Sequence, residues 1–289
     1  MINVAFNMET ADPDDVVTLC WLSDHPQINL VSVLITPGSD DQISLVKHVL
    51  NILNKECLIG ARKPHHPKKC VSDFHYKWFG NNIPNDIECE KGSDVLAESY
   101  KRFNDLVVLS GAPLGNVYDY LVSGNRLNEL IVQGGFAGDN VVPEEYRLDK
   151  FKGKITCPTF NLGGDKVAAK FITSCNLIND QYYVSKNVCH GVCYDYNFHQ
   201  ELKKYKDNRR GLGEIFFGME TYLKYHTHGK LFHDPLAATA ILSKDVCDFV
   251  PVNLVYNKGE WGSELNENSN KKISVKFNKN TFEKVFFGY

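Results

Sequence analysis

Four carboxylates fall within seven residues near the start of the chain: Glu9, Asp12, Asp14 and Asp15. They lie where residues 3–9, typical of a strand, give way to a helical pattern over residues 14–23. Mutual repulsion makes such a cluster unfavourable unless a cation neutralises it, and this many hard oxygen ligands favour Ca²⁺ or Mg²⁺ over a transition metal. The alternative is helix capping by Asp12 and Asp14, which gives no reason for Glu9 and Asp15.

Two further segments combine polar residues with a helix start. His233 and Asp234 precede Pro235 and open an apolar helix, although a helix cap beside a buried histidine explains this pair equally well. Asn161 ends a predicted strand, and the Gly163-Gly164 pair after it lets the backbone approach a ligand closely. Asp165 is expected to act only as the N-cap of the next helix.

Other reactive or charged groups favour plainer interpretations. A zinc site is conceivable from Cys189, His190, Cys193 and His199, but the paired spacing of zinc ligands is missing. The basic run over residues 203–210 is interpreted as a solvated helix end, because no aromatic residues are interleaved to stack on bases.

Strand-length apolar runs alternate with helical periods along most of the chain. This predicts an α/β fold with a mainly parallel central sheet flanked by helices, and ligands at the carboxyl ends of its strands. The predicted strands are residues 3–9, 28–36, 106–110, 130–133, 154–161 and 181–188, and the predicted helices are residues 14–23, 42–54, 94–104, 114–121, a segment from 165, and most of 197–243. Residues 61–93 are expected to be a long loop, and strands at 249–256 and 273–277 a small antiparallel C-terminal addition.

Length and composition limit the class of protein. The 289 residues, 43% of them hydrophobic, fit one domain spanning residues 1–289. A net charge of −3 argues against nucleic acid or lipid surfaces as partners, and no apolar run is long enough to span a membrane. Glu9 interrupts any signal-peptide core, and nine scattered cysteines suit reduced thiols, so a cytoplasmic protein is expected.

Taken in order, these motifs resemble the inosine-uridine preferring nucleoside hydrolase family. That family has an Asp-x-Asp-Pro-x-x-Asp-Asp segment, a Gly-Gly strand end, and Gly-Pro-Leu-Thr-Asn, Asn-x-x-x-Asp-x-x-Ala-Ala and His-Asp-Pro segments. The counterparts here are residues 9–15, 134–135, 111–116, 161–169 and 233–235. The resemblance implies an enzyme that hydrolyses the N-glycosidic bond of ribonucleosides around one bound Ca²⁺, and a homo-oligomer, either dimer or tetramer.

The resemblance also implies a role for each matching residue. Asp15 and Asp234 would bind Ca²⁺ together with the main-chain carbonyl of Ser110. Asp14 and Asn161 would hydrogen-bond ribose hydroxyls. His233 would assist departure of the base, a role that suits an imidazole because it titrates near neutral pH.

The chain departs from the family pattern at several positions. The family's second aspartate, a general base and metal ligand, has no aspartate in register here; Glu9 is the expected substitute, with Asp12 as the rival. Ser39, expected to contact the substrate, replaces an asparagine that follows the second strand in many relatives, and Thr159 replaces an acidic sugar contact. These changes leave room for a different or larger 5′ group.

The base pocket is less clearly marked. The aromatic run over residues 74–79 resembles the family's mobile loop, and its Trp78 is expected to stack on the base. Alternative linings are Tyr222, Tyr225, His226, His228 and Trp261.

Three rival functions stay open at this point. One is a binding protein that keeps the fold and metal without turnover, and another is a hydrolase for a modified riboside. Metal-dependent phosphoryl transfer is weaker, because a Gly-rich phosphate loop with Lys and Ser/Thr is absent from the sequence.

Overall fold

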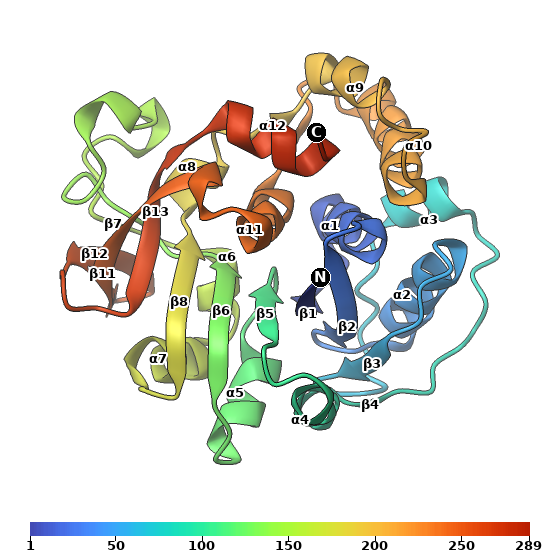
Figure 1. Ribbon diagram of the computed structural model, residues 1–289, viewed down its shortest axis with the longest axis horizontal. Helices are drawn as coiled ribbons and strands as arrows, with labels where there is room; N and C mark the ends of the chain where they lie inside the picture. Colours follow the sequence, from blue (N-terminus) through green and yellow to red (C-terminus); the bar gives the residue numbers. More distant parts are fainter.

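The computed structural model describes residues 1–289 and is built around an eleven-stranded sheet of order β4-β3-β2-β1-β5-β6-β8-β13-β11-β12-β7 (Figure 1). The strands from β4 to β13 in this order run parallel, and β11, β12 and β7 continue the sheet antiparallel. The parallel strands are β1 (Ile2–Met8), β2 (Ile28–Ile35), β3 (Leu58–Ala61), β4 (Glu90–Lys91), β5 (Val107–Ser110), β6 (Leu127–Gln133), β8 (Ile178–Val184) and β13 (Lys271–Phe277). The predicted α/β fold with a mainly parallel sheet and a small antiparallel part is confirmed, with β13 belonging to the parallel portion.

Helices cover both faces of this sheet, as the alternation along β1 shows. Val4, Phe6 and Met8 enter one apolar cluster, whereas Ala5 enters a second cluster on the opposite face. The first cluster is completed by α1 (Pro13–Asp24), α2 (Asp40–Ile52), α10 (Arg210–Tyr225), α11 (His233–Leu242) and α12 (Lys279–Phe287). The second is completed by α4 (Gly92–Arg102), α5 (Gly115–Val122) and α7 (Lys166–Ser174).

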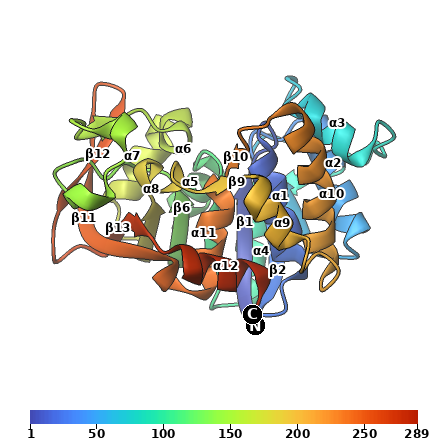
Figure 2. The ribbon, with the colours of Figure 1, turned by 90° about the horizontal axis from the view of Figure 1, so that it is seen from above.

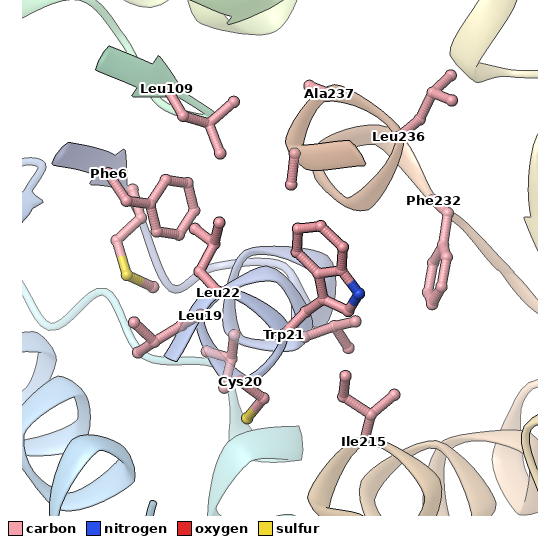
Figure 3. Packing of buried hydrophobic residues seen from close by; sticks show 14 of the residues in the cluster. Phe6, Leu19, Cys20, Trp21, Leu22, Leu109, Ile215, Phe232, Leu236 and Ala237 are labelled. Carbon is pink, nitrogen blue, oxygen red and sulfur yellow. The ribbon is translucent and has the colours of Figure 1, made fainter. Parts of the chain in front are cut away.

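Helix α1 is buried nearly all round, which fits a sequence that is apolar on every side. Figure 3 shows Trp21 and its neighbours packed between Phe6 of the sheet, Ile215 of α10 and Leu236 of α11. The Trp21 indole N–H donates to the Phe286 carbonyl at 2.8 Å, so its buried polar atom is satisfied. Helix α10 lies beside α1 (Figure 2). These contacts fix the orientation of α1 and of the carboxylates on its first turn.

The predicted strand over residues 154–161 is wrong beyond its middle. Only β7 (Thr156–Cys157) pairs, and Asn161 lies in the short helix α6 (Phe160–Gly164). Pro158 has no N–H to donate to a neighbouring strand, so the ladder cannot continue through it. Asp165, as predicted, caps α7 by accepting from the Ala168 N–H at 3.0 Å.

Two other segments contain more structure than predicted. The expected loop over residues 61–93 includes α3 (Asp73–Phe79), whose aromatic residues pack on α10. At the C-terminus, β11 (Cys247–Asn257) and β12 (Glu260–Leu265) form a hairpin through Lys258 and Gly259, both at positive φ. Both segments depend on contacts beyond their own sequence.

The strand predicted over residues 181–188 ends at Val184, and the chain continues into α8 (Lys186–Cys189). The two remaining strands, β9 (Cys193–Tyr194) and β10 (Lys230–Leu231), form a separate antiparallel pair beside α9 (Tyr196–Leu202). None of the helices is both long and apolar enough to cross a bilayer, and all nine cysteines are free.

Candidate active site

The sheet has a switch point between β1 and β5. From β1 the strand order runs outward through β2 to β4, and from β5 it runs outward in the opposite direction. Crevices form at the carboxyl ends of strands at such points. A cavity of about 320 Å³ opens there, lined by Glu9, Ala11, Asp12, Asp14, Asp15, Gly111, Gln133, Phe160, Asn161, His233 and Asp234.

Three buried carboxylates converge in this cavity. Asp14 and Asp15 lie on the first turn of α1, where Pro13 suits the start of a helix, and Asp234 lies on the first turn of α11. One ligand oxygen from each of the three lies within 4.8 Å of the others, an arrangement able to hold a metal ion. The zinc alternative does not assemble, because the cysteines and His199 join no such group.

Backbone hydrogen bonds fix two of these carboxylates. The Glu9 N–H donates to Asp15 Oδ1 at 2.9 Å. Asp14 Oδ2 accepts from the N–H groups of His233 and Asp234 at 3.1 and 3.2 Å. Asp14 therefore joins the start of α1 to the start of α11, two segments far apart in the sequence, and its charge faces the positive end of the α11 dipole.

The carboxylates destabilise one another's charged forms. Burial, followed by the charges of Asp12 and Asp14, raises the pKa of Glu9 to about 7. Burial and the charge of Asp234 raise the pKa of Asp15 well above its usual range, and burial and Asp14 do the same for Asp234. A divalent cation would relieve this repulsion, and the all-oxygen set suits a hard ion. The residues present therefore fit the metal that the family resemblance implies.

Lys230 is a site residue that sequence reasoning missed. Its ammonium group is buried and lies 2.9 Å from Asp12 Oδ1 and 3.4 Å from Asp14 Oδ1. Burial by itself lowers the pKa of Lys230, but the charges of Asp14 and Asp12 outweigh it and raise this pKa overall. One ammonium cannot balance five carboxylates, so the cavity keeps a strongly acidic character.

Asn161 presents a free acceptor to the cavity. Its Nδ2 donates to both the main-chain and the side-chain oxygens of Gln133, each at 2.9 Å. Its Oδ1 is buried and has no hydrogen-bond partner, which leaves it available to a ligand hydroxyl. Gln133 was not predicted as a site residue, although a polar residue at the end of an apolar strand could have indicated it.

His233 lines the same cavity, with Nδ1 2.9 Å from Cys189 Sγ. Burial raises the pKa of the Cys189 thiol, so the sulfur keeps its proton at neutral pH. Burial and the charge of Lys230 lower the pKa of His233 to about 4, rather than leaving it near neutral as expected from the sequence. The ring is therefore neutral at pH 7, and a proton on Nε2 is favoured when the thiol donates to Nδ1.

Three predicted site residues do not line the cavity. Ser39 is the N-cap of α2, and its hydroxyl lies 3.2 Å from Gln42 Oε1. Trp78 packs against Gly218 of α10, which leaves no space for a Cβ there. Ser110 is buried at the end of β5, with its hydroxyl donating to the Ala112 carbonyl at 2.9 Å. The structure instead brings exposed Phe160 to the cavity.

The alternative base-pocket residues also lie outside the lining. Tyr222 stacks on His226 and meets the edge of Phe74. Trp261 is buried in the C-terminal hairpin next to Tyr256. None of the predicted base-pocket residues lines the cavity; Phe160, which was not predicted, does.

Fold and site together define a class: an α/β protein with a buried carboxylate cluster able to hold a metal ion at its switch point, flanked by an amide and an imidazole. The sequence model of the inosine-uridine preferring nucleoside hydrolase family matches residues 8–284, and the chain belongs to this family. It is accordingly an N-glycosyl hydrolase of the nucleoside hydrolase type. The predicted family membership is confirmed.

Solved structures support the fold at low sequence identity. A purine-preferring ribonucleoside hydrolase from Gardnerella vaginalis is 16% identical, with a TM-score of 0.69 and coverage of 99% of this chain and 96% of that one. The inosine-uridine preferring nucleoside hydrolase of Bacillus anthracis is 15% identical, with a TM-score of 0.71 and coverage of 99% of this chain and 98% of that one.

A relative by sequence is an uncharacterized protein of Aquifex aeolicus. It is 27% identical over 287 residues, which are 95% of this chain and 94% of that protein.

Proposed function

We propose that this protein is a Ca²⁺-dependent hydrolase of ribonucleosides that releases free base and ribose. The observation that carries the proposal is the convergence of the Asp14, Asp15 and Asp234 carboxylates with the free Asn161 Oδ1 and the His233 ring on one cavity. Breaking an N-glycosidic bond through an oxocarbenium-like state requires a sugar grip, a positioned water and help for the departing base. This cavity offers a group for each task.

Asp15 and Asp234 are the proposed side-chain ligands of the ion. The Ser110 carbonyl, a further ligand by the family resemblance, belongs to the residue directly before Gly111 of the cavity lining. When bound, Ca²⁺ supplies Lewis acidity and lowers the pKa of a coordinated water. Asp14 belongs to the same buried carboxylate group, and Asp14 and Asn161 are the proposed acceptors of hydrogen bonds from ribose hydroxyls. Both residues are held by hydrogen bonds to neighbouring chain segments, which limits their motion.

Glu9 is the proposed general base and an additional metal ligand, in preference to Asp12. Both carboxylates line the cavity, but Asp12 is engaged by Lys230 at 2.9 Å, whereas Glu9 makes no ion pair. A carboxylate without a lysine partner is freer to accept a proton from water. We expect Glu9→Gln to lower the rate constant kcat for nucleoside hydrolysis far more than Asp12→Asn does.

His233 and Phe160 are the proposed contacts to the base. A neutral His233 with its proton on Nε2 acts as a hydrogen-bond donor to a ring nitrogen or oxygen of the leaving base. Phe160 is 68% exposed at the cavity mouth, where its ring is open to stacking. Ser39 and Trp78, expected from the sequence to touch substrate, would require movement of α3 or of the loop before α2 to do so.

The test is release of reducing sugar from inosine, uridine, adenosine, cytidine and a nitrophenyl riboside, with and without a Ca²⁺ chelator. Chelator-sensitive release that returns with Ca²⁺ would support the proposal and rank the bases. Bound Ca²⁺ without sugar release from any compound would favour a binding protein instead. Release only from modified ribosides would favour the specialised hydrolase.

A pair of variants separates the metal site from general damage. Asp234→Asn should lose Ca²⁺ binding, measured by calorimetry, together with activity, while Asp207→Asn at an exposed position should change neither. His233→Ala should slow natural nucleosides more than the nitrophenyl riboside, because an activated leaving group departs without a hydrogen bond from His233.

A cytoplasmic location and a homo-oligomeric state, dimer or tetramer, are further parts of the proposal. The nine free cysteines suit a reducing compartment. Sedimentation equilibrium of the reduced protein would measure the oligomeric state directly, and a monomer at all concentrations would exclude oligomerisation.

A further inference from the structure

A second compartment of about 190 Å³ adjoins the carboxylate cavity. The two spaces share Gln133, Phe160 and His233 in their linings, so a ligand can extend from one into the other. The second compartment adds Lys186 and His190. It has room for several waters or for one substituent of a substrate.

The charge of this compartment is opposite to that of the carboxylate cavity. No aspartate or glutamate lines it. The groups whose charges act most on His190 are all cations or imidazole: His233, Lys150, Lys186 and Lys230. Neither Lys186, which lines the compartment, nor Lys150, an exposed residue in contact with His190, has a carboxylate oxygen within 4.0 Å.

Donors in the compartment are also incompletely used. Lys186 Nζ donates to the Pro158 carbonyl at 2.8 Å, which leaves two of its three protons free. Lys150 Nζ lies 2.6 Å from His190 Nδ1. Because an ammonium group can only donate, Nδ1 accepts, and a neutral His190 carries its proton on Nε2 as a further donor.

From this polarity we infer that the protein acts on a riboside bearing an anionic group, with the sugar at the carboxylate end and the anion against Lys186 and His190. The inference rests on the proposed function and narrows its substrate class. A neutral nucleoside would offer no charged acceptor to the free donors of Lys186 and His190, whereas an anion would accept charge-assisted hydrogen bonds from them.

Two sources of the anion share this chemistry. One is a 5′-phosphate on the ribose, and the other is a carboxylate on the base. Both place a negative charge at a distance from the sugar hydroxyls, and both accept several hydrogen bonds. The experiment must therefore distinguish them by matched compounds.

Binding of fragments tests the compartment without requiring turnover. Calorimetric titrations compare ribose with ribose 5-phosphate, and uracil with orotate, against the full-length protein loaded with Ca²⁺. Each pair differs only by the anionic group. We expect one anionic fragment to bind at least ten-fold more tightly than its neutral partner, with the advantage shrinking as ionic strength rises.

Variants assign that advantage to the compartment. Lys186→Met combined with Lys150→Met should reduce the ten-fold preference to less than two-fold. Lys152→Met is the matched control, because Lys152 is an exposed lysine two residues from Lys150 that pairs with Asp149 at 2.6 Å and, unlike Lys150, makes no hydrogen bond to His190. Circular dichroism of each variant would check that it is folded.

The outcomes separate this inference from the proposed function. A preference for ribose 5-phosphate identifies the phosphate as the anion, and one for orotate identifies the base carboxylate; hydrolysis of uridine 5′-monophosphate or orotidine should then exceed that of uridine by a similar factor. Equal binding within both pairs, or a preference that survives loss of both lysines, overturns the inference even if uridine is hydrolysed. Sugar release from none of the compounds counts against the proposed function alone, because the fragment titrations still decide the binding site.

Discussion

Replacing Gly111 with alanine should disable the metal site while leaving the fold intact. Gly111 follows β5 and lies against the Asp234 carboxylate. A Cβ on residue 111 would lie 2.5 Å from Asp234 Cγ and 2.8 Å from Oδ1, whereas ordinary contacts begin at 3.4 Å. The backbone of Gly111 does not have a positive φ, so alanine brings no backbone strain of its own.

The size of the effect follows from these distances. Restoring ordinary contact requires a displacement of about 1 Å, and a misplacement of that size at a reacting group costs on the order of 10²-fold in rate. The carboxylate end of Asp234 can turn aside more easily than β5 or α11 can move, so the displacement falls on the proposed metal ligand. Overpacking a buried site costs about 1–3 kcal/mol of unfolding free energy, which a chain of this size tolerates.

The assay combines Ca²⁺ titration by calorimetry, sugar release and thermal denaturation. Gly111→Ala should lose Ca²⁺ affinity and about 100-fold in kcat/KM, with a cooperative unfolding transition retained. Gly163→Ala is the control: it lies two residues after Asn161, has no atom within 4 Å of its added Cβ and should behave as wild type. Wild-type affinity and rate in Gly111→Ala would refute the placement of Asp234 as a metal ligand.

Three further predictions concern residues around the site. Lys230→Met should lower the unfolding free energy of the metal-free protein by about 3–5 kcal/mol, because the buried Asp14 carboxylate loses its partner. Denaturant titration measures this change, and an unchanged unfolding free energy would show that the ion pair does not stabilise the fold. Burial lowers the pKa of His75 from its usual 6.5 to about 4. The unfolded chain therefore binds a proton at this residue before the folded chain does, and the protein loses stability as the pH falls from 6.5 towards 4. From these two pKa values we expect the unfolding free energy to fall by about 2 kcal/mol by pH 5. Urea titrations at pH 7.5 and pH 5 should show a smaller loss of stability in His75→Gln than in the wild type. His228→Gln, at an exposed position, is the control and should lose as much stability as the wild type. Equal losses in the two variants would contradict the prediction. Cys189→Ala should reduce kcat for uridine more than for the nitrophenyl riboside, since the thiol orients the His233 ring, and equal reductions would show that it has no such role.

Much of the fold follows from patterns that are local in the sequence. Alternation of strand and helix periods along residues 3–54 and 94–133 identifies the parallel sheet, because period-two and helical spacing each report how one segment buries its own apolar side. Predictions failed where the deciding contact lies outside the segment. Helix α3 packs against α10, and β12 pairs with β11 in a register that the residues of β12 alone do not indicate.

The candidate site also combines residues that the sequence indicates with contacts that only the fold creates. The sequence alone pointed to the carboxylates at residues 9–15, Asn161 and the His233-Asp234 pair as candidates, because their types and chain order carry the family pattern, and the structure brings them to one cavity. Only the tertiary structure decided that Lys230 ion-pairs with Asp12 and Asp14 and that Cys189 meets His233. Such contacts join residues tens to hundreds of positions apart, and their distances, burial and pKa shifts arise from packing that no local spacing specifies.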